Sequence, residues 1–135
     1  FEKVGSKYYY LGTYQKVTWY TAVHNCHSIG GEMISLADNA TLAEITKVIS
    51  HNKYRDFWLD LTDLGGAGEF LSISSGLRPG FVDWCESATS STNISGNCVN
   101  IEHRNSSTPC MKSVSCIDFK SFICESRKPR TISIL

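Results

Sequence analysis

Hydrophobic and polar positions at the start of the chain follow two different periods. Lys7 to Leu11, which includes three successive tyrosines, is typical of a β-strand. From Thr18 to Ile29 the apolar residues recur with the spacing of one helix face: Trp19, Ala22, Val23, Cys26 and Ile29. Thr18 is a suitable N-cap, and Gly30-Gly31 is a typical stop signal. The pattern therefore predicts a strand followed by a helix.

A second helix is predicted after a short apolar segment at Met33–Leu36. It runs from about Asn39 to Ser50 and has one apolar face, formed by Leu42, Ile45, Val48 and Ile49. The next apolar run, Phe57–Leu61, lacks helical periodicity and predicts a buried strand. These elements would supply the core of the domain.

Periodicity is lost from Asp63 to Asn97, a stretch rich in glycine and serine in which Phe70, Leu71 and Ile73 suggest one short strand. So long a loop is unusual in a compact domain unless it is functional and stapled. Strands are predicted again at Cys98–Glu102 and Cys116–Glu125. The order of strand, two helices, strand, long loop and strands indicates an α+β fold.

Length and charge narrow the class of protein. The chain has 135 residues, which suits one domain, placed at residues 1–126 with a C-terminal tail at 127–135. Thirteen basic and thirteen acidic residues give no net charge, so no nucleic-acid partner is expected. No apolar run reaches the length of about 18 residues needed for a membrane span, so no membrane insertion is expected.

Six cysteines indicate an oxidising compartment, because cytosolic thiols are kept reduced. Their even number allows complete pairing, but spacing alone does not choose the pairs. Three glycosylation sequons, at Asn39, Asn93 and Asn105, favour the same location. We therefore expect a secreted glycoprotein whose sequence begins at a mature or trimmed end. The sequence leaves open whether an anchor or stalk lay upstream.

The motifs together resemble the C-type lectin-like domain family over roughly residues 7 to 126. The matching residues are Trp19-x-x-Ala22-x-x-x-Cys26, Gly30-Gly31, Trp58-Leu59-Asp60-Leu61, Gly68-Glu69-Phe70, Trp84, Cys98-Val99, Cys116 and Phe122-Ile123-Cys124-Glu125. The resemblance implies a double-loop fold with small antiparallel sheets, and the disulfides Cys26–Cys124 and Cys98–Cys116. The form is short, like that of secreted invertebrate members that serve pathogen recognition, immune regulation or reproduction.

Cys85 and Cys110 lie outside the framework that the family shares. Pairing with each other is the simplest interpretation, and it would tie the long loop beside Trp84 to the segment before Cys116. The alternative is a bond between chains, which would produce a homodimer or heterodimer. Free, exposed thiols are the least favoured option in a secreted domain.

Calcium ligands expected from the resemblance are missing. Ca²⁺ takes six to eight oxygens, several of them from carboxylates. The position of the first sugar-site motif holds Ala88-Thr89-Ser90, and that of the second holds Met111-Lys112-Ser113. Asp63 falls where an auxiliary ligand often lies, but one carboxylate does not make a site. We expect no calcium at the sugar site and no cofactor, with Lys112 standing electrostatically in place of the cation.

The sequence contains no catalytic pattern, so we expect no enzyme activity. His24 and His27 flank Cys26 but lack a third metal ligand, and no nucleophile elbow or phosphate loop occurs. Trp84 is expected to be a packing anchor. The candidate ligand-contact residues are Arg78, Phe81, Glu86 and Lys112.

Two hypotheses of function follow. In the first, the chain is a secreted recognition module that binds a protein or a glycan-bearing surface through the long-loop face without calcium. In the second, it is a carbohydrate-binding lectin that uses an atypical site, built from hydrogen bonds and aromatic stacking.

Overall fold

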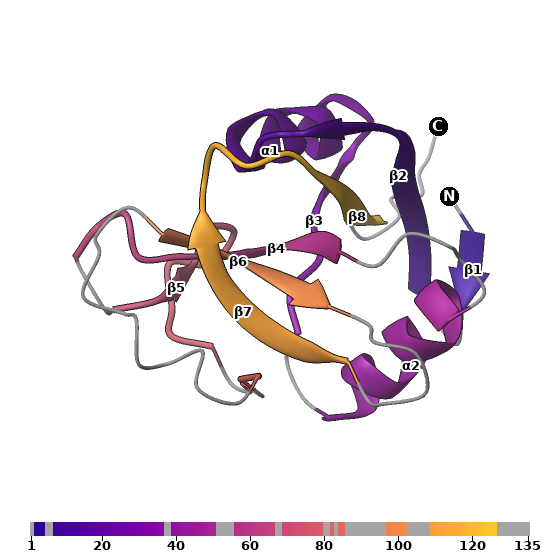
Figure 1. The fold of residues 1–135 in the computed structure, drawn as a ribbon. Coiled ribbons are helices and arrows are strands. Elements are labelled where there is room, and N and C mark those ends of the chain that lie inside the picture. The colour runs from indigo at the N-terminus through magenta and orange to yellow at the C-terminus, as the bar shows by residue number, and fades with distance from the viewer. Residues whose placement is uncertain are drawn as a thin grey trace, which may run out of the picture.

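The computed structural model describes residues 2–4, 7–36, 39–50, 56–66, 69–79, 82, 84–85, 97–102 and 109–126. Two helices and a mixed sheet form an α+β fold (Figure 1), as predicted. The elements are β1 (Glu2–Val4), β2 (Lys7–Val17), α1 (Trp19–Ser28), β3 (Gly31–Met33), α2 (Asn39–Ser50), β4 (Asp56–Thr62), β5 (Leu71–Ser72), β6 (Asn97–Glu102), β7 (Cys110–Ser115) and β8 (Lys120–Ser126). Neither helix in this part of the chain has the length and apolar character of a membrane span.

The last strand, β8, lies inside the sheet and not at its edge. The strand order is β1-β2-β8-β4-β6-β7, with β3 also paired to β8 and β5 paired to β4. β8 runs antiparallel to β2 and parallel to β4. Segments from the start, middle and end of the described chain are therefore hydrogen-bonded side by side.

Helix α1 begins and ends where the sequence predicts. The Thr18 side chain accepts a hydrogen bond from the Thr21 amide at 3.3 Å, which satisfies one of the unpaired amides of the first turn. Gly30 has a φ of +83°, a conformation that other residues rarely adopt, and so ends the helix. The face that α1 buries consists of Trp19, Ala22 and Cys26.

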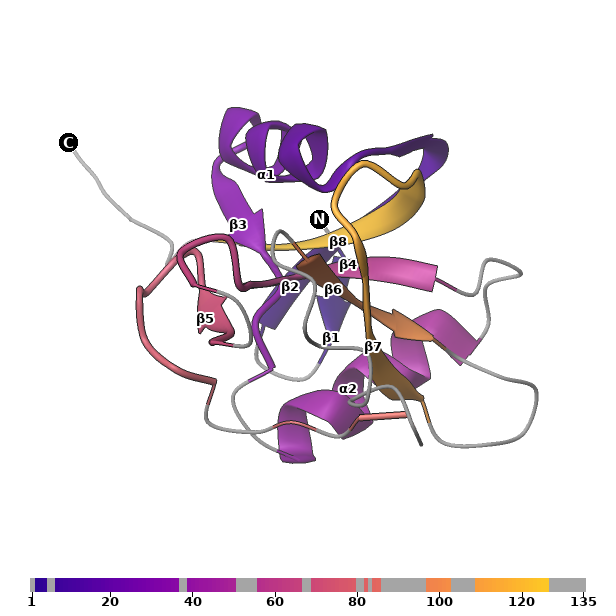
Figure 2. The same ribbon diagram turned by 60° about the vertical axis from the view of Figure 1, so that its left-hand side comes forward.

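Two hydrophobic clusters lie on opposite faces of the sheet, because successive side chains of a strand point in opposite directions. On β4, Phe57 and Leu59 belong to the cluster that contains Ile45 of α2, whereas Trp58 belongs to the cluster that contains Trp19 of α1. Figures 1 and 2 show the two helices on opposite sides of β4. This two-sided burial explains why Phe57–Leu61 is a continuous apolar run.

Two indoles connect the elements around α1. Trp19 Nε1 donates to the Leu59 carbonyl of β4 at 2.8 Å, and Trp58 Nε1 donates to the Val17 carbonyl of β2 at 2.9 Å. Both tryptophans are buried, so each polar nitrogen needs such a partner. The expected core role of Phe57 and Trp58 is confirmed.

The three disulfides join the pairs that were expected. Cys26–Cys124 ties α1 to β8 across a sequence separation of 98 residues, and Cys98–Cys116 ties β6 to the turn that follows β7. Cys85 pairs with Cys110 within the chain. A bond that closes about 100 residues stabilises a fold by roughly 4–5 kcal/mol in the chain-entropy picture.

The predicted strand Cys116–Glu125 is present but starts too early, because residues 116–119 form a turn and β8 begins at Lys120. The Asp118 amide donates to the Ser115 carbonyl at 3.1 Å, and the chain reverses there. Ile117 and Phe119 gave the turn a strand-like apolar pattern, although both side chains are exposed. The preceding strand, β7, was missed, and β2 extends six residues beyond the predicted end at Leu11, to Val17.

We predict that Gly12→Ala lowers the free energy of unfolding by about 1–3 kcal/mol, the usual cost of overpacking. A Cβ at Gly12 would lie 2.2 Å from the ring of Phe122, so the ring would have to move. Urea denaturation measures the change. Gly65→Ala is the control, because a Cβ there meets no atom within 4 Å, and we expect it to leave stability unchanged or slightly raised. Equal stability of the two variants would contradict this account.

Candidate functional site

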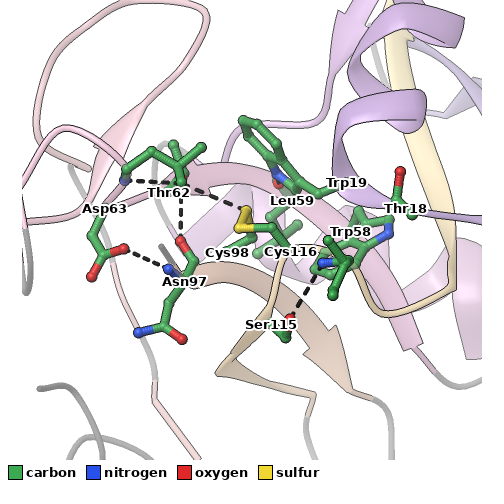
Figure 3. The surroundings of a disulfide bond; sticks show 12 residues. Thr18, Trp19, Trp58, Leu59, Thr62, Asp63, Asn97, Cys98, Ser115 and Cys116 are labelled. Carbon is green, nitrogen blue, oxygen red and sulfur yellow. Dashed lines mark hydrogen bonds between the residues drawn. A yellow bond between two sulfur atoms is a disulfide. The ribbon is translucent and has the colours of Figure 1, made fainter. Parts of the chain in front are cut away.

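The long loop between β4 and β6 begins and ends at a buried polar clamp (Figure 3). Asp63 Oδ1 accepts a hydrogen bond from the Asn97 amide at 2.7 Å, and the Asp63 amide donates to the Asn97 carbonyl at 3.1 Å. Thr62 Oγ1 donates to the same carbonyl at 2.9 Å. Both ends of the loop are thereby fixed beside the Cys98–Cys116 disulfide.

This clamp defines the role of Asp63, which stands where the family often has an auxiliary calcium ligand. Its side chain is fully buried, and one carboxylate oxygen is bound to the Asn97 amide. A buried carboxylate with a backbone amide donor is a structural element of the loop base. In the described residues, no group of three or more His, Cys, Asp or Glu side chains could hold a metal ion.

A second tether holds the loop at Trp84. Cys85 is bonded to Cys110 of β7, and its amide donates to the Met111 carbonyl at 2.8 Å. Trp84 is half-buried and packs on Phe70, with 5.4 Å between the ring centroids. The expectation that Trp84 is a packing anchor is therefore confirmed.

The β7 segment that would carry calcium ligands in a sugar-binding member supplies no carboxylate here. Met111 is buried in the core cluster that contains α2. Lys112 Nζ lies 3.9 Å from Glu102 Oε2 on the neighbouring strand β6, and Ser113 offers only a neutral hydroxyl. Ca²⁺ prefers several charged oxygens, so the residues present on β7 do not fit it.

Of the predicted contact residues, the structure describes Arg78 and Lys112. Arg78 is exposed and pairs with Glu69 at 2.8 Å, within the loop and apart from the Lys112–Glu102 pair. Exposed pairs of this kind contribute little to stability, so Arg78 is available for contact with a partner. Phe81 and Glu86 lie outside the described residues.

Most of the other residues singled out in the sequence lie outside the described part of the chain. Asn39 is the first residue of α2, and its side chain is not among those described. Asn93 and Asn105 lie outside the described residues, as do Ala88-Thr89-Ser90 and the tail at 127–135. His24 and His27 are exposed on α1.

Asp60 is a buried charge that the sequence did not reveal. Its Oδ2 accepts hydrogen bonds from Ser72 Oγ at 2.5 Å and from Ser74 Oγ at 2.9 Å. Burial raises the pKa of this carboxyl from 3.8 to about 6, although the serine hydroxyls oppose the shift. In the part of the chain that the structure describes, Oδ1 has no hydrogen-bond partner. The cluster fastens the turn after β5 to β4.

Comparison with known proteins identifies the family. The family model for the lectin C-type domain matches residues 15–126. This chain therefore belongs to the C-type lectin domain family.

Relatives and solved structures agree with this family assignment. C-type lectin 37Db of Drosophila melanogaster is 31% identical over 125 residues, which cover 91% of this chain and 79% of that protein. Accessory gland protein Acp29AB of the same species is 29% identical over 126 residues, covering 93% of this chain and 50% of that protein. The chain thus spans about half the length of that relative. The structure of human lithostathine superposes with a TM-score of 0.79 at 26% identity, covering 94% of this chain and 88% of that one.

We predict that Asp60→Asn removes a pH dependence of stability. The pKa of Asp60 is higher in the folded state than in the unfolded state. Its contribution to the free energy of unfolding is therefore complete below about pH 4 and is lost as the pH rises through about 6. Over this pH range the free energy of unfolding of the wild type should fall by about 3 kcal/mol because of Asp60.

The free energy of unfolding of both proteins, measured by denaturation from pH 4 to 7.5, checks this prediction. The variant should gain stability relative to the wild type as the pH rises. Glu69→Gln, at an exposed carboxylate, is the control and should follow the wild type. Parallel curves for Asp60→Asn and the wild type would show that Asp60 does not titrate as described.

Proposed function

We propose that the chain is a secreted, non-catalytic recognition module that binds its target through the long-loop face without calcium. The observation that supports this proposal is the chemistry of β7. Buried Met111 and the cation Lys112 occupy the positions at which sugar-binding members hold metal ligands. Lys112 forms an ion pair with Glu102, so this carboxylate has a partner that does not depend on metal.

A protein partner is favoured by the apolar character of the loop. Four large apolar side chains on its described part are exposed: Leu64, Ile73, Leu77 and Val82. Together with the Arg78–Glu69 pair they supply the apolar contacts and charged rim that protein interfaces use. A sugar would gain little from these four side chains, because they offer neither an aromatic ring for stacking nor a hydrogen-bonding group for its hydroxyls.

Secretion is supported by the three disulfides, which suit an oxidising compartment. The name of the accessory gland relative supports a role in a reproductive secretion. Innate immunity is the alternative setting in this proposal. Non-catalytic recognition agrees with the absence of a catalytic motif in the sequence.

Calcium should leave the melting temperature unchanged. A metal that binds only the native state raises stability by about 2.7 kcal/mol at a hundredfold excess over its Kd. Thermal melts in CaCl₂, in MgCl₂ at equal ionic strength and in EDTA measure this effect. A rise that is specific to Ca²⁺ would contradict the proposed calcium independence.

The long-loop face should carry partner binding. We predict that Leu77→Ser and Arg78→Ala each reduce the recovery of a cross-linked partner from the native secretion by about tenfold, equivalent to ~1.4 kcal/mol of binding free energy. Ile117→Ser is the matched control, because Ile117 is 68% exposed and Leu77 is 67% exposed, but Ile117 lies on the β7–β8 turn. If all three variants recover the partner equally, the long loop is not the binding face.

A further inference from the structure

The three disulfides differ in how deeply they are buried. The cysteines of Cys26–Cys124 and Cys98–Cys116 belong to the hydrophobic cluster that contains Trp19 of α1, and none of them is more than 3% exposed. Cys85 is 7% exposed, Cys110 is half-buried, and neither is a member of the two hydrophobic clusters. A reductant dissolved in water therefore reaches the Cys85–Cys110 bond more easily than the other two.

The Cys85–Cys110 bond also lies apart from the pairings that hold the sheet together. Cys110 is the first residue of β7, an outer strand of the sheet, whereas Cys124 lies on the inner strand β8. Figure 1 shows the start of β7 and helix α1 on opposite sides of β4. Opening this bond leaves the pairing of β8 with β2, β3 and β4 in place, together with both buried disulfides.

The bond fastens one segment of the long loop to β7. Next to the disulfide, an isolated bridge pairs Trp84 with Met111, and the Cys85 amide donates to the Met111 carbonyl at 2.8 Å. The Trp84 ring packs on Phe70, which belongs to the same loop. A bridge of this length is shorter than the strands of ordinary sheets, so the position of this segment depends on the covalent bond.

Lys112 offsets the negative charge that faces Cys110. Glu102 is the residue opposite Cys110 in the ladder of β6 and β7. Its carboxylate lies 3.9 Å from Lys112 Nζ, and Lys112 shares a face of β7 with Cys110, two residues away. A nearby ammonium group favours both the approach of an attacking thiolate and the thiolate form of a cysteine that leaves when a disulfide opens.

We propose that Cys85–Cys110 is a reversible redox switch of the long loop. A thiolate of an extracellular dithiol oxidoreductase attacks Cys110 Sγ, forms a mixed disulfide and displaces the Cys85 sulfur as a thiolate. The second thiol of the oxidoreductase then attacks its own sulfur in the mixed disulfide and releases Cys110. Two electrons and two protons pass from the dithiol to the protein, so the dithiol becomes a disulfide and both cysteines become thiols.

Opening the bond lowers the affinity of the long-loop face. This consequence rests on the function proposed for that face, because Leu77 and Arg78 lie between the clamp at Asp63 and the tether at Cys85. A loop held at both ends loses less conformational entropy on binding than a loop held at one, so release of one end weakens binding. The selectivity of the reduction does not rest on that function.

Timed reduction of the folded protein measures the selectivity. The protein is incubated without denaturant with dithiothreitol or with thioredoxin, free thiols are blocked with N-ethylmaleimide, and the labelled peptides are quantified by mass spectrometry. Cys85 and Cys110 should be labelled together, at least about tenfold faster than the four buried cysteines, which become accessible only when the core opens. Oxidised glutathione should then restore the bond.

Substitution of the neighbouring lysine tests the electrostatic argument. Lys112→Ala should slow the reduction about twofold to fivefold, because Glu102 is then left uncompensated opposite Cys110. Lys7→Ala is the matched control and should leave the rate unchanged. The Lys7 side chain is 42% exposed and pairs with a glutamate on β8, whereas the Lys112 side chain is 45% exposed.

Release of the loop is measured by NMR and by partner recovery. The Cys85 amide should exchange with deuterium about tenfold faster in the selectively reduced protein, because its bond to Met111 opens more often. The double variant Cys85→Ser/Cys110→Ser should keep both buried disulfides. Like the reduced wild type, it should recover about tenfold less of the cross-linked partner than the oxidised wild type does, and added reductant should not change that recovery.

Equal labelling rates for all six cysteines, or no labelling before the protein unfolds, would overturn the proposal. Unchanged exchange at the Cys85 amide after selective reduction would overturn it too. Full recovery of the partner by the reduced protein, when Leu77→Ser recovers little, would show that the tether does not control binding and would also overturn it. If Leu77→Ser itself recovers the partner fully, the function proposed for the long loop fails, whereas selective labelling with faster exchange at Cys85 still supports the switch.

Discussion

Insertion of the last strand into the middle of the sheet is the constraint on which the fold depends. β8 pairs with β2 on one side and with β3 and β4 on the other, so the sheet is incomplete until the end of the domain docks. Pairings between residues so far apart in sequence have a large loop-closure cost. The Cys26–Cys124 bond removes much of that freedom from the unfolded chain.

A core fixed in this way lets the long loop vary. The loop contributes Phe70 and Trp84 as partly buried residues packed on the core, and its ends are held by the Asp63–Asn97 clamp and the Cys85–Cys110 bond. Exposed residues between these anchors, such as Leu77 and Arg78, can change with little effect on the sheet. Beside the loop base, Lys112 of β7 and Glu102 of β6 form an ion pair, and the proposed calcium independence rests on that pair.

Sequence patterns predicted the elements that depend mainly on residues close together in the chain. α1 was predictable because its signals are local. Thr18 caps its start, an apolar face begins at Trp19, and Gly30 follows its end. The start of β8 was not predictable, because Ile117 and Phe119 resemble strand residues, although both are exposed in the turn between β7 and β8. The Asp60 cluster was also hidden, since Ser72 and Ser74 reach the carboxylate only when β5 folds back.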